Sequence, residues 1–210
     1  MKIFVYDSGK GILSFIKLIL KSNKNNDYYF FMDKDFFPLG EKDSVTIKER
    51  LNYIIEQCNK DFFDLLIICC NTASSELDSS LKNKCKCPIF DVLSYSLSFI
   101  NNGLLLCSHR LYTNLKDKYN SLIDCQILIN NIENNNIFAC IKWMKENISL
   151  LKEKNLILGC THLTLISHLF KKNKIIDPLI YLVDDLPNSK EFTYSGNKYA
   201  MNEISKFIHK

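Results

Sequence analysis

The chain has 210 residues, of which 47% are hydrophobic and 24% charged, a composition typical of a folded globular protein. Its formal net charge of +4 comes from 27 basic and 23 acidic residues spread along the chain, so we expect no nucleic-acid partner, which would need a clustered basic face. No stretch approaches the roughly 20 uncharged apolar residues of a membrane span, and Asp7 and Lys17 interrupt the N-terminal apolar run. We therefore expect no membrane association, no signal peptide and a cytoplasmic location.

Short apolar runs rich in β-formers alternate with longer helical patterns along the whole chain. In the first part we predict strands at residues 2–6, 28–32, 65–69 and 88–92, and helices at 11–21, 43–60 and 73–84. In the second part we predict strands at residues 103–107, 125–129 and 156–158, and helices ending near 119 and spanning 137–152, 163–172 and 198–209. The Asn-rich residues 130–136 are predicted to form a loop.

This alternation indicates an α/β fold with parallel sheets that helices cover on both faces. Because the pattern restarts near residue 95, we predict two similar α/β domains with the active site in the cleft between them. The first domain would take residues 1–94 plus about 180–210, and the second about 95–179.

Ligands of such sheets bind beyond the C-terminal ends of the strands, so the residues that follow each strand matter. These segments are polar, and two of them place a cysteine directly before a predicted helix. They read Asp7-Ser8-Gly9, Cys70-Asn71-Thr72, Cys107-Ser108-His109 and Cys160-Thr161-His162.

The chain contains nine cysteines, an odd number, and several lie inside apolar strand-like runs. Without an export signal we expect reduced thiols rather than disulfides. The pair Cys85 and Cys87 has no second pair at zinc-finger spacing, and the four histidines do not cluster, so we predict no metal site.

Cys70 and Cys160 occupy matching places in the two halves, each at the start of a helix. The helix dipole and the free backbone amides at such a position are expected to lower a thiol's pKa. Cys69 should point to the other face of its strand, into packing. A lone buried cysteine is usually a small core residue, but two at matching strand ends could act as an acid and a base on opposite faces of a substrate. That arrangement suits inversion of a stereocentre.

Together these segments resemble the glutamate racemase family, the cofactor-independent enzymes of the aspartate/glutamate racemase superfamily. The resemblance runs nearly end to end and rests on VYDSGKGIL, MDKDFFPLGEKDS, CCNTAS, GCTHLTL and FTYSGN. The Cys-Asn-Thr and Gly-Cys-Thr-His segments, in this order and spacing, are its most specific part. The resemblance implies an acidic amino acid as substrate, no cofactor, a product that supplies peptidoglycan synthesis, and a homodimer, although oligomeric state is not readable from the sequence.

Carried onto this chain, the resemblance makes Cys70 and Cys160 the two catalytic bases. Asp7 would assist Cys70, and His162 would assist Cys160. Glu133 would also assist Cys160, by its position in LINNIENNN. Other roles stay open: a helix cap or a core position for these side chains, or a solvated surface position for Glu133. The residues implied to line the substrate site are Ser8, Pro38, Leu39, Gly40, Asn71, Thr72, Ser108 and Thr161.

The chain departs from the family pattern at several of these positions. Leu39 stands in place of the usual Tyr between Pro38 and Gly40, and the Thr-x-x-Thr pattern reads Ser108 to Leu111, which loses one hydroxyl. Arg110 near that place could compensate for it. These changes leave three functions open: racemisation of glutamate, racemisation of aspartate or another acidic amino acid, and a weakened relative that only binds a ligand or a protein.

Overall fold

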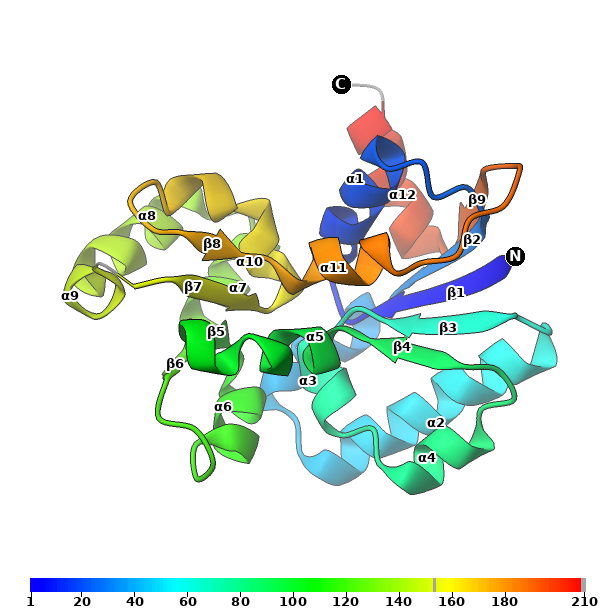
Figure 1. The fold of residues 1–210 in the computed structure, drawn as a ribbon, viewed down its shortest axis with the longest axis horizontal. Helices are drawn as coiled ribbons and strands as arrows, with labels where there is room; N and C mark the ends of the chain where they lie inside the picture. The colour runs from blue at the N-terminus through cyan, green and yellow to red at the C-terminus, as the bar shows by residue number, and fades with distance from the viewer. Residues whose placement is uncertain (153, 209–210) are drawn as a thin grey trace.

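The computed structural model describes residues 1–152 and 154–208, which fold into two lobes, each built on its own parallel sheet (Figure 1). The predicted α/β fold with two helix-flanked parallel sheets is therefore confirmed. The C-terminal ends of β1 (Lys2–Asp7) and β3 (Leu65–Ile68) point toward the second lobe, and this orientation places the site between the lobes (Figure 1).

The first sheet has five parallel strands in the order β4-β3-β1-β2-β9. Its other strands are β2 (Asp27–Met32), β4 (Ile89–Asp91) and β9 (Thr193–Gly196). The helices that cover it are α1 (Ile12–Lys21), α2 (Ser44–Lys60), α3 (Asn71–Ser75), α4 (Ser79–Lys84), α11 (Pro178–Asp184) and α12 (Lys198–Ile208). Two short 3₁₀ turns, Lys34–Phe36 and Leu39–Glu41, follow β2.

Alternate side chains of β1 enter two different hydrophobic clusters, one on each face of the sheet. Ile3 and Val5 pack with α1, α11 and α12, whereas Phe4 and Tyr6 pack with α2, α3 and α4. Continuous burial of a strand on both faces explains its unbroken apolar sequence. The same alternation confirms that Cys69 belongs to the first cluster and Cys70 to the second.

The second sheet has four parallel strands in the order β6-β5-β7-β8. They are β5 (Leu104–Cys107), β6 (Leu122–Asp124), β7 (Leu156–Gly159) and β8 (Ile175–Ile176). The remaining helices are α5 (Val92–Ser98), α6 (His109–Leu115), α7 (Gln126–Glu133), α8 (Ile137–Glu146), α9 (Ile148–Leu151) and α10 (Thr161–Leu165), with 3₁₀ turns at Ile100–Asn102 and Ser167–Leu169.

The predicted strand at residues 125–129 is wrong, because β6 ends at Asp124 and α7 begins at Gln126. Leu128, Ile129 and Ile132 are buried, which is the spacing of one helix face, and a short, largely apolar run cannot distinguish a strand from a helix. The predicted loop at 130–136 is wrong for its first residues, since α7 continues to Glu133. Asn136 then caps α8 by accepting the amide of Ala139 at 3.2 Å.

Other predicted helices are shorter than expected. The helix predicted at 73–84 is two helices, α3 and α4, and Asp78 caps the second by accepting the amide of Leu81. The helix predicted at 163–172 is α10 followed by a 3₁₀ turn, and α5 and α11 were not predicted. The last helix ends at Ile208, and the predicted end at His209 lies outside the described residues.

Strands from residues 2–91 and 193–196 share one sheet, while strands from 104–176 share the other. Leu179, Leu182 and Val183 of α11 pack into a cluster of the first sheet. The exact domain boundaries stay a prediction. None of the helices in the described part of the chain is both long and apolar enough to cross a membrane.

Candidate active site

The residues that follow β1, β3, β5 and β7 meet at one pocket between the two sheets. Its empty volume is ≈ 270 Å³, including open solvent. The pocket is lined by Ser8, Phe37, Pro38, Leu39, Gly40, Cys70, Thr72, Ser108, Gln126, Ile129, Cys160, Thr161 and His162.

Cys70 enters the pocket from the end of β3, as the residue that precedes α3. Its sulfur lies 3.2 Å from the Ser8 hydroxyl oxygen, and the side chain is buried. Burial, and next the nearby Asp7 carboxylate, raise the pKa of Cys70 to about 12. The expected lowering of this pKa is therefore wrong: loss of hydration outweighs the few amides of a five-residue helix.

Cys160 enters from the end of β7, as the residue that precedes α10, and it is more exposed than Cys70. Its sulfur lies 3.6 Å from Nδ1 of His162, and Nε2 of the same ring lies 2.8 Å from Oε2 of Glu133. Burial alone would lower the pKa of His162, but the hydrogen bonds to Cys160 and Glu133 outweigh it and raise this pKa to about 10. A cationic ring beside Cys160 partly neutralises a negative charge on its sulfur.

Glu133 lies at the end of α7 and is held by the turn after β1. Its Oε2 accepts the backbone amide of Lys10 at 2.8 Å, and its backbone carbonyl accepts Nζ of Lys10. A side chain at Gly9 would bring a Cβ to 2.9 Å from the same Oε2 and 3.2 Å from Nε2 of His162. Close approach of the backbone to this ion pair therefore requires glycine at position 9.

Asp7 does not line the pocket but lies behind it, fully buried at the end of β1. Its carboxylate accepts the Thr161 hydroxyl at 2.8 Å and the Gly9 amide at 3.3 Å. Burial raises the pKa of Asp7 to about 6, and the nearby His162 and the Thr161 hydroxyl oppose that rise. The carboxylate thus joins the strand end of the first sheet to the start of α10 in the second lobe.

The opposite wall of the pocket also combines segments of both lobes. The hydroxyls of Thr72 and Ser108 are 2.6 Å apart, and Ser108 also caps α6 by accepting the amide of Leu111. A Cβ at Gly40 would lie 1.8 Å from Oε1 of Gln126, so glycine is required for this close contact. Leu39 is buried beside it.

Asn71 does not reach the pocket lining, although it adjoins Cys70. Its Oδ1 accepts the Ser96 hydroxyl at 2.8 Å, while its Nδ2 is buried without a hydrogen-bond partner among the described residues. The expectation for Arg110 is wrong: its Nε donates to Glu76 at 2.7 Å, and it does not line the pocket. Leu111 packs into a core cluster of the second lobe.

Three pocket residues were missed in the sequence: Phe37, Gln126 and Ile129. The ring of Phe37 packs 5.4 Å from the ring of His162, and its place directly before Pro38 was an available signal. Gln126 and Ile129 were hidden because their helix, α7, was interpreted as a strand and a loop.

The one group of three residues in the described part of the chain that could hold a metal ion is outside this pocket. It consists of Cys58, Cys85 and Cys87, whose sulfur atoms all lie within 4.8 Å of one another. The pair Cys85 and Cys87 was known from the sequence, but its approach to Cys58 was not.

No protein-family model matches the chain, but individual proteins do. It is 32% identical to a glutamate racemase of Aliarcobacter butzleri over 82% of this chain and 75% of the relative. In structure it resembles a glutamate racemase of Bacillus anthracis with a TM-score of 0.82 at 17% identity, covering 99% of this chain and 94% of the other. A glutamate racemase of Francisella tularensis in complex with D-glutamate gives a TM-score of 0.78 at 24% identity, covering 93% of this chain and 86% of that one.

Proposed function

This chain belongs to the glutamate racemase family, and on that premise we propose that it interconverts L- and D-glutamate by proton transfer between Cys70 and Cys160. The observation that carries the proposal is that both cysteines, one from each lobe, line a single pocket. A pocket that only bound a ligand would not need a thiol from each side.

In this mechanism one cysteine acts as a thiolate and the other as a thiol. The thiolate takes the α-proton from one face of the substrate: the C–H bond breaks and an S–H bond forms. The opposite thiol then gives its proton to the other face of the carbanion and is left as a thiolate. Proton number and charge are conserved, and the reverse reaction restores the starting state.

The environments of the two sulfurs differ, which suits opposite roles in one turnover. With a pKa of about 12, Cys70 is a thiol at neutral pH and can donate, with the Ser8 hydroxyl 3.2 Å away. The sulfur of Cys160 has the His162 ring at 3.6 Å, which stabilises a negative charge there. Glu133 and Asp7 act through their partners: Glu133 holds His162, and Asp7 holds Thr161.

The remaining pocket residues would bind the substrate. The hydroxyls of Ser8, Thr72 and Thr161 are suited to the substrate carboxylates and to the charge that develops on the α-carboxylate during proton removal. We further propose that the reaction needs no cofactor and that the enzyme is a homodimer. It would act in the cytoplasm, without nucleic-acid or membrane partners. Its D-glutamate would supply peptidoglycan synthesis and so contribute to cell shape.

Circular dichroism of L-glutamate during incubation with the pure protein tests the reaction. We expect the signal to decay to zero with the wild type, and kcat to fall by about 10²- to 10⁴-fold or more with Cys70→Ser or Cys160→Ser. Cys69→Ala is the matched control, because Cys69 packs on the other face of β3 and should leave kcat unchanged. A constant signal with the wild type at high protein concentration would contradict the proposal.

Aspartate is the second candidate substrate, because the altered position Leu39 lines this pocket. Comparing kcat/KM for L-glutamate and L-aspartate separates the two. Exchange of the α-hydrogen in D₂O separates either racemase from a protein that only binds its ligand, which should show no exchange.

A further inference from the structure

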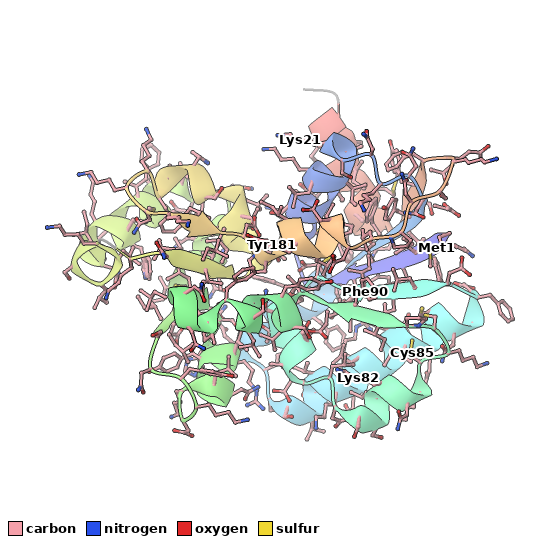
Figure 2. All side chains as sticks on the ribbon, in the orientation of Figure 1. Met1, Lys21, Lys82, Cys85, Phe90 and Tyr181 are labelled. Atoms are coloured by element: carbon pink, nitrogen blue, oxygen red, sulfur yellow. The ribbon has the colours of Figure 1, made fainter. Side chains whose placement is uncertain are left out.

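A cluster of three thiols lies in the first lobe, outside the pocket, and the function proposed above does not use it. Cys58 is fully buried near the end of α2, while Cys85 and Cys87 are half-buried in the connection between α4 and β4. The sulfur of Cys87 lies 3.6 Å from that of Cys58 and 3.7 Å from that of Cys85. Figure 2 labels Cys85 at this connection, beside α2 and α4.

These distances are close to those that a bound metal ion would impose. Zinc binds cysteine sulfur at about 2.3 Å, so two sulfurs of one tetrahedral site lie about 3.8 Å apart. The distances from Cys87 to Cys58 and to Cys85 are within a few tenths of an ångström of that value, and all three sulfurs are within 4.8 Å of one another. Binding would therefore need little movement of the side chains.

The backbone around the cluster is held in place before any ion binds. Asn59, next to Cys58, donates from Nδ2 to the carbonyl of Lys84 at 2.8 Å and accepts the amide of Lys86 at 2.8 Å. The Asn59 side chain thus holds the connection between α4 and β4 by hydrogen bonds to the residues on both sides of Cys85. Such partners outside the ligand shell orient metal ligands and support affinity.

Access and charge also fit a cation. Cys85 and Cys87 are partly exposed, so an ion can enter from solvent and a water molecule can complete a fourth position. Three thiolates on a divalent ion leave one negative charge, and Lys84 and Lys86 flank Cys85 in the chain. Sulfur-only ligands select thiophilic cations such as Zn²⁺ over Mg²⁺ or Ca²⁺.

We propose that Cys58, Cys85 and Cys87 form a Zn²⁺ site that fastens the α4–β4 connection to α2. The site is structural and independent of the racemase pocket, so its test does not depend on the outcome for the proposed function.

The test is titration of the fully reduced, metal-free protein with Co²⁺, followed by displacement with Zn²⁺. Cobalt reports sulfur ligands through a charge-transfer band in the near ultraviolet. We expect the wild type to bind one Co²⁺ per chain with this band and to release it to Zn²⁺. Zn²⁺ should also raise the unfolding temperature of the wild type, because it binds the folded state.

Two variants at half-buried positions and one matched control identify the ligands. Cys85→Ala/Cys87→Ala should lose the band and the Zn²⁺-dependent temperature shift while keeping racemase activity; the double variant avoids the buried Cys58. Asn59→Ala should weaken binding by about 10- to 100-fold, the effect usual for a partner outside the ligand shell. Cys140→Ala, a buried thiol of the second lobe, should bind as the wild type does.

Cys70 and Cys160 are also thiols, so the titration is repeated with Cys70→Ser/Cys160→Ser, which should keep the band. Absence of the band from the reduced wild type would overturn the proposal. Full retention of the band by Cys85→Ala/Cys87→Ala would overturn it as well.

Discussion

Nε2 of His162 lies 2.8 Å from Oε2 of Glu133, and both side chains are buried at the edge of the pocket. The pair joins α10 to the end of α7, and the other ring nitrogen of His162 faces the sulfur of Cys160 at 3.6 Å. The charge of Glu133 therefore acts on the sulfur of Cys160 through the ring of His162, although Glu133 itself does not line the pocket.

Glu133→Gln should lower the pKa of His162 from about 10, because it removes the charge of a partner that raises it. The ring then loses its proton at a lower pH, so the alkaline limb of the kcat/KM profile should move toward neutral pH. The profile is measured by circular dichroism of L-glutamate. Glu56→Gln, at an exposed position of α2, is the control and should leave the profile unchanged. An alkaline limb that stays in place in Glu133→Gln would show that His162 does not control it.

Asp7→Asn should remove a pH dependence of stability. Burial raises the pKa of Asp7 from 3.8 to about 6, so the folded protein holds this proton more tightly than the unfolded chain. Stability from this group is fully present below pH 3.8 and is lost as the pH rises through about 6. The full difference is about 3 kcal/mol, at about 1.4 kcal/mol for each pKa unit.

Urea unfolding at about pH 4 and about pH 7 measures this effect. From about pH 4 to about pH 7, titration of Asp7 should cost the wild type about 2 kcal/mol in free energy of unfolding, and Asp7→Asn should not show this loss. Asp27→Asn, on the exposed start of β2, is the control and should track the wild type. Parallel curves for the wild type and Asp7→Asn would mean that Asp7 does not titrate in this range.

Gly11→Ala should damage the joint between the lobes. Its Cβ would lie 1.9 Å from Oγ1 of Thr161 and 3.0 Å from Nδ1 of His162, so Thr161 must move away from Asp7. Overpacking of this kind typically costs about 1–3 kcal/mol, and we expect kcat to fall as well. Urea unfolding and the racemisation assay measure the two effects. Lys17→Ala, at an exposed position of α1, should change neither stability nor kcat. Normal kcat in Gly11→Ala would show that the position of Thr161 is unimportant.

Gln126→Ala tests a pocket residue that the sequence did not reveal. Its Oε1 accepts the amide of His109 at 3.2 Å and its Nε2 donates to Asn130 at 2.9 Å, so the side chain is held as a wall of the pocket. Loss of this wall should raise KM for glutamate about tenfold, which corresponds to about 1.4 kcal/mol of lost binding free energy. kcat should change little, because the amide transfers no proton. Initial rates at varied glutamate separate the two constants, with Gln57→Ala as control; a selective fall in kcat would contradict this role.

Local sequence determined the elements and the strand ends. The apolar runs of β1, β3, β5 and β7 are buried on both faces, so their hydrophobic pattern alone marks them as strands of a parallel sheet. Parallel strands bring their C-terminal ends to one edge, which is why Cys70 and Cys160 could be selected as pocket residues from spacing. The prediction failed at residues 125–129, where a short apolar run fits either a strand or one face of a helix.

Tertiary structure decided how residues far apart in the chain meet. Glu133 contacts His162 because α7 packs against α10, and Cys58 joins Cys85 and Cys87 because α2 packs against α4. It also decided the protonation of Cys70, whose pKa rises through complete burial and the nearby Asp7 instead of falling at a helix start. Spacing along the chain determines which residues precede a helix, but burial and charge at a site depend on every segment that packs around it.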